Sequence, residues 1–214
     1  MTPDAFVQAF HEARASAILR TADPEAMQPA MDAAVRGGFR IIEFTLTCPD
    51  VYEHLAAYAQ RDDLIVGAGT VLTVEQAERS VEAGARCLVS PVMDPEIIAA
   101  AVRLEVAIMP GCFSATEMFD AHRHGAHLCK LFPAPGTGPT YVKSILAPLP
   151  FLKIVPTNGV HQNNAEAFLK AGAHAVGFTT ALFDPNDMAA GRFEMIEQRA
   201  RTLLDAVGAP AATA

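Results

Sequence analysis

Short apolar runs alternate along the chain with longer stretches in which apolar residues recur every three to four positions. The short runs predict buried strands, and the longer stretches predict amphipathic helices. The expected strands are 15–19, 40–46, 64–66, 87–90, 106–109, a run around Lys130 within 126–133, 153–155 and 174–177. A helical stretch follows each strand, and one further amphipathic helix, about 4–14, precedes the first.

Several helix boundaries carry a recognisable signal. Asp23-Pro24 predicts a helix start, with aspartate as the cap and proline in the first turn. Thr73 to Gln76 and Ser114 to Glu117 have the spacing of capping boxes. The last helix is expected over about 187–207.

This alternation indicates the fold. Strands that alternate strictly with helices predict a parallel sheet, and eight such units predict a closed (β/α)8 barrel. We therefore expect an α/β protein, a TIM barrel in which 1–207 forms a single domain that includes the N-terminal helix. The remaining 208–214 are expected to be a disordered tail. A doubly wound open sheet is the competing architecture.

The charge of the chain limits its partners. The 214 residues carry a net charge of −8, so neither nucleic acid nor an anionic membrane surface is an expected partner. No apolar run is long enough for a spanning helix, and the N-terminus shows no export signal. The 4 cysteines lack metal-like or redox-like spacing, which favours reduced thiols in a cytoplasmic protein.

The most informative stretch for chemistry is Ala126 to Pro133, where Lys130 is the one lysine in a mostly apolar strand. A buried ammonium is costly, and losing its proton is the usual escape. Lys130 is therefore a candidate neutral amine and a nucleophile towards a carbonyl carbon. The alternative is a lysine at a strand end whose charged head reaches water.

Polar residues gather at the carboxyl ends of the expected strands, where barrel enzymes hold their active sites. Alternation along 40–46 turns Glu43 away from the helices and into the barrel mouth. There Glu43, Lys130 and Arg20 would couple their protonation, although an ion pair of Glu43 with Arg20 or Arg40 is the structural alternative. The candidate site residues are Arg20, Glu43, Thr45, Thr70, Pro91, Lys130, Thr157, Asn158, Gly159, Thr179 and Thr180.

Two further patterns are weaker. Gly67 to Thr70 is expected to be a glycine turn after a strand, but it lacks the third glycine of a dinucleotide site and the lysine of a P-loop. His122, His124 and His127 have metal-like spacing, yet the first two should end a helix and the third should begin a strand. We therefore expect no metal site.

The loops after the last two strands fit the usual phosphate site of a barrel. Asn158-Gly159 follows one strand and Thr179-Thr180 follows the next. Backbone amides and a short helix N-terminus there are suited to bind an anion. Two ordinary helix caps are the equal alternative.

With these residues in hand, the chain resembles the class I aldolases for 2-keto-3-deoxy-6-phosphogluconate and 4-hydroxy-2-oxoglutarate. The resemblance covers about 12–207, and its lysine and glutamate motifs are the most specific. The segments that carry it are Ile42-Glu-Phe-Thr-Leu-Thr47, Gly67-Ala-Gly-Thr-Val71, Met109-Pro-Gly111, Lys130-Leu-Phe-Pro133 and Pro156-Thr157.

The resemblance implies a lyase that cleaves a 2-keto-3-deoxy or 2-keto-4-hydroxy acid to pyruvate and an aldehyde such as glyceraldehyde 3-phosphate. Lys130 would form the Schiff base, and Glu43 would be the general acid and base. Thr70 and Thr157 would contact the pyruvate part, and Arg20 would bind an anionic end of the substrate. The resemblance also implies a homotrimer that needs no metal and no cofactor, since an iminium supplies the electrophile.

The chain departs from the family pattern near the substrate. Thr47 stands where some members carry arginine, which matches the branch that uses the arginine of the first strand. Asn158-Gly159 replaces a Gly-Gly pair, and Thr179-Thr180 replaces Gly-Ser. Asparagine tolerates positive φ and threonine keeps a hydroxyl, which is compatible with phosphate binding in a more crowded pocket.

Two other functions fit the same residues. One is a barrel isomerase or phosphosugar-binding enzyme in which Lys130 only pairs with a phosphate. The other is a catalytically silent barrel that binds keto acids as a sensor. A covalent adduct with pyruvate separates the lyase from both alternatives.

Overall fold

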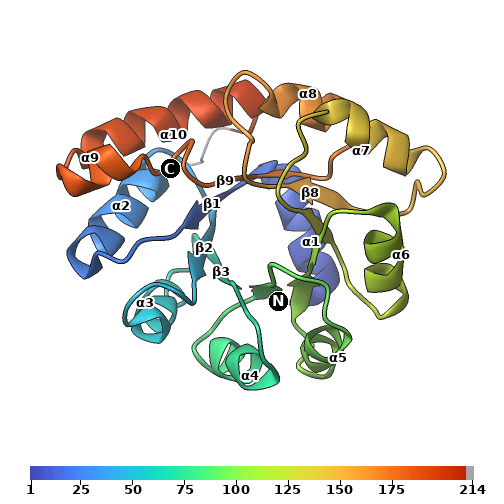
Figure 1. The fold of residues 1–214 in the computed structure, drawn as a ribbon. Coiled ribbons are helices and arrows are strands. Elements are labelled where there is room, and N and C mark those ends of the chain that lie inside the picture. Colours follow the sequence, from blue (N-terminus) through green and yellow to red (C-terminus); the bar gives the residue numbers. More distant parts are fainter. Residues whose placement is uncertain (211–214) are drawn as a thin grey trace.

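The computed structural model describes residues 1–210 and shows helices arranged around a curled parallel sheet (Figure 1). The strands are β1 (Ala15–Leu19), β2 (Ile41–Thr45), β3 (Ile65–Gly69), β4 (Cys87–Val89), β5 (Ala107–Met109), β6 (Gly111–Cys112), β7 (Cys129–Leu131), β8 (Ile154–Pro156) and β9 (Val176–Phe178). The helices are α1 (Pro3–Ala13), α2 (Pro24–Arg36), α3 (Val51–Tyr58), α4 (Val74–Glu82), α5 (Pro95–Arg103), α6 (Ala115–Arg123), α7 (Pro139–Leu146), α8 (Ala165–Lys170), α9 (Pro185–Ala189) and α10 (Phe193–Val207). The predicted α/β class is confirmed.

The strands form two parallel sheets. Six lie in the order β5-β4-β3-β2-β1-β9, and the other three lie in the order β6-β7-β8. Backbone hydrogen bonds also pass between the sheets, because Ile108 of β5 accepts from the N–H groups of His127 and Leu128, at 3.3 Å each. On the other side, the N–H of His174 donates to the carbonyl of Ile154 at 2.8 Å. All carboxyl ends of the strands therefore share one edge of the curled sheet.

Two strand predictions need correction. β3 continues to Gly69, so the glycine turn predicted at 67–70 is wrong, and most of that segment is strand. The strand predicted at 106–109 is followed directly by the short β6. Pro110 separates them because it has no N–H to give to the ladder.

The C-terminal part of the chain also differs from expectation. The single helix predicted over 187–207 is wrong, since α9 and α10 are separate helices with Gly191 between them at a φ of +66°. Gly208 ends α10 in the left-handed region, which glycine adopts at low cost. The disordered tail predicted at 208–214 lies mostly outside the described residues. Within 1–210 no helix has the length and apolar content needed to cross a bilayer.

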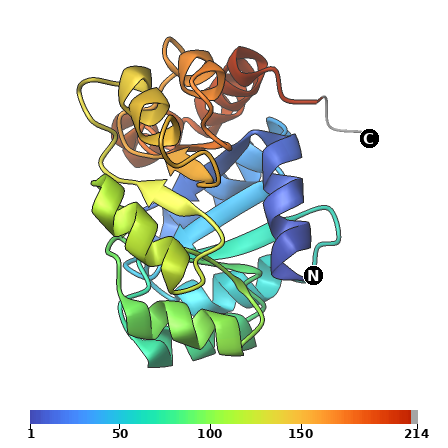
Figure 2. The same cartoon turned by 90° about the vertical axis from the view of Figure 1, so that its right-hand side faces the viewer.

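Helix α1 seals the amino end of the curled sheet. Its Phe6, Val7 and Phe10 are buried against interior side chains that include Leu128 and Val155. Figure 2 shows this helix lying across the amino ends of the strands. The interior is therefore filled at that end, and a functional site is left to the opposite, carboxyl end.

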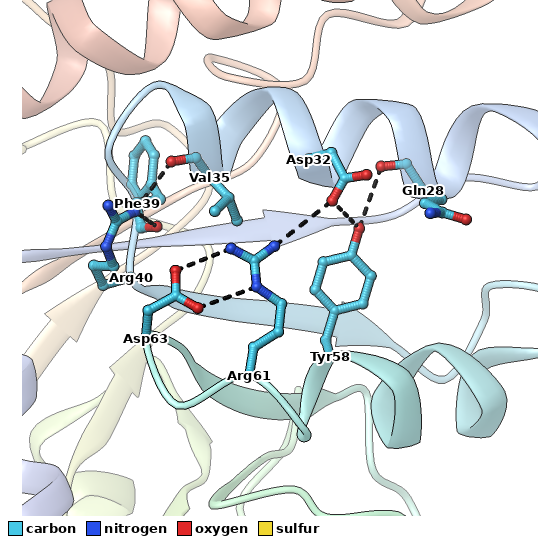
Figure 3. Close-up of polar contacts among 8 residues, drawn as sticks. All are labelled: Gln28, Asp32, Val35, Phe39, Arg40, Tyr58, Arg61 and Asp63. Carbon is cyan, nitrogen blue, oxygen red and sulfur yellow. Dashed lines mark hydrogen bonds and ion pairs between the residues drawn. The ribbon is translucent and has the colours of Figure 1, made fainter. Parts of the chain in front are cut away.

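A cluster of polar side chains links α2 to α3 (Figure 3). Tyr58 of α3 donates to Oδ1 of Asp32 on α2 at 2.7 Å, and its hydroxyl also reaches the carbonyl of Gln28 at 3.3 Å. Arg61, in the loop before β3, makes two hydrogen bonds to Asp63 and lies 3.9 Å from Asp32. These contacts fix the two helices that precede β2 and β3, and so help to hold both strands in register.

Candidate active site

Lys130 lies in the middle of β7 and is only 5% exposed. Its Nζ stands 4.9 Å from the centre of the Phe132 ring. Burial lowers the pKa of the Lys130 ammonium below its ordinary value, the charge of Glu43 opposes that change, and the charge of Arg20 adds to it. The side chain is too deeply buried to extend into bulk water as a snorkelling lysine would, and its burial favours the neutral amine.

Glu43 points from β2 into the same interior and is 4% exposed. Burial raises the pKa of its carboxyl group, while the positive charges of Lys130 and Arg20 act in the opposite direction. Its Oε1 has no hydrogen-bond partner among the described residues. A buried oxygen without a partner is costly, so this atom is suited to meet a group brought by a ligand or by water.

Gly69 leaves room for that carboxylate. A side chain at this position would overlap Oε1 of Glu43, because the glutamate leans diagonally across β3. Gly67 lies on the same face two residues earlier, and a Cβ there would meet only ordinary contacts, the closest being the Cys87 carbonyl oxygen at 3.4 Å. Gly69 is therefore required by the neighbouring side chain and not by a turn.

Arg20, at the end of β1, is held by Thr70 at the end of β3. Its guanidinium donates to Oγ1 of Thr70 at 3.2 Å. Thr70 has a φ of +62°, an unusual conformation for a threonine that commonly marks functional positions. The Arg20 charge acts on both Lys130 and Glu43, and Thr70 holds Arg20 by a hydrogen bond. We call these four residues one electrostatic unit.

A cavity of about 430 Å³ opens beside this unit. Six of the residues predicted from sequence line it: Arg20, Lys130, Thr157, Asn158, Thr179 and Thr180. Glu43 and Thr70 do not line it, but the charge of Glu43 interacts with that of Lys130, and Thr70 accepts a hydrogen bond from Arg20. The predicted site is therefore brought together for the most part at one place.

Besides Glu43 and Thr70, three other predicted residues do not line the cavity: Thr45, Pro91 and Gly159. The hydroxyl of Thr45 is engaged by that of Thr47 at 2.9 Å, and it also lies 3.5 Å from Sγ of Cys48. Pro91 is packed against Gly111, so closely that a side chain on that glycine would overlap its carbonyl. For Thr45 and Pro91, a position at a strand end did not bring the side chain into the cavity.

The loop after β8 has the geometry that its sequence predicts. Asn158 and Gly159 have φ values of +58° and +101°, so asparagine occupies a left-handed position here. Thr157 is fully buried, and its Oγ1 has no hydrogen-bond partner among the described residues. A hydroxyl that is buried at the wall of a cavity without a partner is available to a ligand.

The loop after β9 departs from one expectation. Asp184 caps α9 by accepting hydrogen bonds from the N–H groups of Asn186 and Asp187. The short helix N-terminus therefore does not offer those amides to an anion. The N–H groups of Thr180 and Ala181 have no partner within 1–210, so loop amides and threonine hydroxyls are the donors that remain.

Sequence reasoning missed part of the cavity wall. Phe132, Phe183, Pro185, Met188 and Ala189 supply an apolar surface, and Thr21, Ala22 and Asp23 line the side nearest α2. Phe183 and Met188 are buried side chains of the segment after β9, where the pattern predicted only a loop and a long helix. Asp23 was recognisable from sequence only as a helix cap.

The histidine pattern finds a structural explanation. His124 caps α6, and its Nδ1 lies 2.7 Å from the carbonyl of Asp120. His122 lies in the last turn of the same helix, and its ring centre lies 4.7 Å from that of Phe151, with the ring planes tilted by 42°. Among the described residues no group of three or more His, Cys, Asp or Glu side chains is arranged to hold a metal ion.

A buried lysine beside a buried carboxyl group, at the carboxyl edge of a parallel sheet, is the arrangement expected of an enzyme that uses an amine on a carbonyl substrate. The family model "Aldolase: KDPG and KHG aldolase" matches residues 7–199. The chain therefore belongs to the KDPG and KHG aldolase family and is an aldolase, a carbon–carbon lyase. The resemblance stated from its motifs is confirmed.

Individual relatives agree with this assignment. A probable 2-dehydro-3-deoxy-6-phosphogalactonate aldolase of Rhizobium meliloti is 36% identical over 90% of this chain and 91% of its own length. A 2-dehydro-3-deoxy-phosphogluconate aldolase of Treponema pallidum is 36% identical over 84% of this chain and 87% of its own. The KDPG aldolase of Legionella pneumophila, solved with pyruvate as a covalent carbinolamine, aligns with a TM-score of 0.84 at 26% identity, covering 92% of this chain and 97% of that one.

The space around Glu43 gives a first prediction. Gly69→Ala should force the Glu43 carboxylate to swing away and reduce the kcat of aldol cleavage by about tenfold or more, up to the ~10²- to 10⁴-fold that a general acid–base group contributes. Gly67→Ala adds the same methyl group to the same face and should cost far less.

Steady-state kinetics of both variants measures the contrast. A Glu43→Ala background supplies the control, because alanine has none of the side-chain atoms that a Cβ at 69 would overlap. Gly69→Ala should then add little further loss. Equal losses in the two glycine variants, or a full further loss in the Glu43→Ala background, would show that Gly69 serves only the strand.

Proposed function

We propose that the chain is a class I, Schiff-base aldolase. It cleaves 2-keto-3-deoxy-6-phosphogluconate, or a related 2-keto-4-hydroxy acid, to pyruvate and an aldehyde such as glyceraldehyde 3-phosphate. The observation that carries this proposal is the burial of Lys130 at the wall of the cavity, with its pKa lowered by that burial. The lysine supplies the electrophile itself as an iminium, so the reaction requires neither a metal nor a cofactor.

The chemistry assigns one role to each buried group. Nζ of Lys130 attacks the C2 carbonyl, and the carbinolamine loses water to form a protonated imine. The C3–C4 bond breaks as its electrons move into the imine, while Glu43 takes the proton of the C4 hydroxyl directly or through water. The resulting enamine is protonated at C3, and hydrolysis of the imine releases pyruvate and the free lysine.

The proposal also includes the contacts at the two ends of the substrate. Thr70 and Thr157 contact the pyruvate part, and Arg20 binds its carboxylate. The unpartnered Oγ1 of Thr157 and the proximity of Arg20 to Lys130 support this arrangement. The far end of the substrate lies between the loops that follow β8 and β9, against Asn158-Gly159 and Thr179-Thr180.

The scaffold that we propose is a single domain, 1–207, closed as a (β/α)8 barrel. In it β5 and β6 act as one strand interrupted at Pro110. The hydrogen bonds to Ile108 support closure on one side of the three-stranded sheet, and the parallel bridge between Thr157 and Gly177 supports it on the other. Closure would place both reacting groups on the inner face of one continuous wall.

We also propose a cytoplasmic homotrimer whose small-molecule partners are the keto acid and pyruvate. An exposed aromatic cluster supports self-association: Phe119 and Phe151 are 40% and 45% exposed, with ring centres 6.3 Å apart. Aromatic side chains left in water on one face are typical of protein–protein contacts.

A second prediction concerns the Schiff base. Incubation with pyruvate and borohydride should attach one reduced pyruvyl group per chain, on Lys130, because the reductant traps the imine. Mass spectrometry of the digested protein locates the adduct. Lys170→Ala removes an exposed lysine that pairs with Glu166 and should leave the yield unchanged.

Lys130→Ala should abolish this labelling. An undiminished yield in that variant, or an adduct on another lysine, would contradict the mechanism. Retained cleavage activity without any adduct would favour a non-covalent enzyme. Absence of both activity and adduct, with keto-acid binding kept, would favour a silent sensor.

A third prediction concerns proton transfer. Glu43→Gln keeps the shape of the side chain but cannot exchange a proton, so kcat should fall by about 10²- to 10⁴-fold. Pyruvate trapping measured alongside turnover separates a loss of imine formation from a loss of carbon–carbon cleavage. Near-normal turnover in this variant would assign Glu43 a structural role.

A fourth prediction concerns the far end of the substrate. Thr180→Val removes a hydroxyl at similar volume, and each charge-assisted bond to a phosphate is worth about 1.5–3 kcal/mol. The kcat/KM for a phosphorylated substrate should therefore fall about ten- to a hundredfold, whereas an unphosphorylated keto acid should be nearly unaffected.

Kinetics on both substrate types tests this, and the wild type is expected to prefer the phosphorylated one. Equal losses on the two substrates would mean that Thr180 supports the fold. A wild-type preference for the unphosphorylated acid would mean that the pocket does not use phosphate.

A further inference from the structure

The two ends of the cavity differ in charge. Arg20 and Lys130 are the cationic side chains among the described residues that line it. Both belong to the reacting end, since the guanidinium of Arg20 is bonded to Thr70 and its charge acts on Lys130. The wall nearest α2 and α9 instead carries one carboxylate, Asp23, and only uncharged side chains beside it.

Asp23 follows β1 and caps the first turn of α2. Its Oδ1 accepts from the N–H of Glu25 at 3.0 Å, whereas its Oδ2 accepts no hydrogen bond from any residue within 1–210. Because β1 and β9 are neighbouring strands, the loop with Asp23 lies beside the loop with Thr179 and Thr180. Helices α2 and α9, which follow these loops, also pack side by side (Figure 1).

We propose that Asp23 is a specificity-determining residue that weakens the binding of a phosphate dianion and tolerates an uncharged, hydroxyl-bearing end. The proposal deepens the proposed function, on which it rests, because it concerns the far end of the same substrate. A phosphate ester carries nearly two negative charges at neutral pH. The cationic side chains that line the cavity within 1–210, Arg20 and Lys130, are both assigned to the reacting end in the proposed function. A hydroxyl has no net charge and is able to donate a hydrogen bond to Oδ2.

The consequence is a smaller preference for the phosphorylated substrate over the unphosphorylated one. Hydroxyl and amide donors of the loops after β8 and β9 favour the binding of a phosphate, and the Asp23 charge weakens that binding. Asp23 is exposed, so solvent and salt screen its charge, and the effect is expected to be about three- to tenfold at low ionic strength. The chain should therefore still prefer the phosphate ester over the free sugar acid, by a factor that the Asp23 charge reduces.

The substitution that isolates the charge is Asp23→Asn. Asparagine caps helices as well as aspartate does, so α2 keeps its first turn. Asp94→Asn is a matched control, because Asp94-Pro95-Glu96 repeats Asp23-Pro24-Glu25 and Oδ1 of Asp94 accepts from the N–H of Glu96 at 2.8 Å. Asp94 does not line the cavity.

Kinetics with 2-keto-3-deoxy-6-phosphogluconate and 2-keto-3-deoxygluconate, which differ only in the phosphate, provides the first readout. Asp23→Asn should raise kcat/KM for the phosphorylated acid about three- to tenfold through KM, and the gain should shrink as sodium chloride is added. The unphosphorylated acid should gain nothing, and Asp94→Asn should change neither. A gain shared by both substrates, or one that is insensitive to salt, would overturn the proposal.

Binding of inorganic phosphate, followed by calorimetry or NMR titration, keeps the inference testable apart from catalysis. Asp23→Asn should tighten phosphate binding about three- to tenfold relative to wild type, and Asp94→Asn should not. Unchanged phosphate binding in Asp23→Asn would contradict the role of the charge. A failed pyruvate adduct on Lys130, with phosphate binding tightened as expected, would instead reject the proposed aldolase mechanism and leave the charge effect standing.

Discussion

The exclusion of water from Lys130 and Glu43 is the physical constraint on which the site depends. Burial lowers the pKa of the lysine and raises that of the glutamate, so one cause drives both groups towards their uncharged forms. Each charge opposes the pKa shift that burial causes in the other group, so the protonation states of the two groups are coupled. A neutral amine is a nucleophile, and a raised pKa makes a carboxylate a stronger proton acceptor.

The surrounding structure maintains this desolvation. Helix α1 fills the amino end of the sheet interior with Phe6 and Phe10, which keeps water from approaching Lys130 and Glu43 from that end. Gly69 gives the Glu43 side chain its space, and the ring of Phe132 lies against the ammonium of Lys130. An uncompensated buried charge is expensive, so these features tie the stability of the fold to the chemistry of the site.

Much of this arrangement was predictable from sequence because it follows from local periodicity. The alternation of strands and helices indicated the α/β class, and the apolar run around Lys130 indicated its burial. The position of Gly69 was not readable in the same way, because a glycine after a strand normally indicates a turn. Its actual reason is a diagonal contact with a side chain from another strand. The apolar wall with Phe183 and Met188, and the second role of Asp23, likewise depend on how the loops after β1 and β9 approach each other in space.

The position of α1 has a consequence for the order of assembly. This helix precedes every strand in the chain, yet part of its cover comes from late segments: the ring of His174 contacts the carbonyl of Val7 at 2.9 Å across 167 positions of sequence. Contacts between such distant segments form late, since a long loop must close before they contribute. The hydrophobic face of α1 is therefore covered completely only after the last strands have formed. During synthesis Phe6, Val7 and Phe10 lack part of the cover that they have in the folded protein.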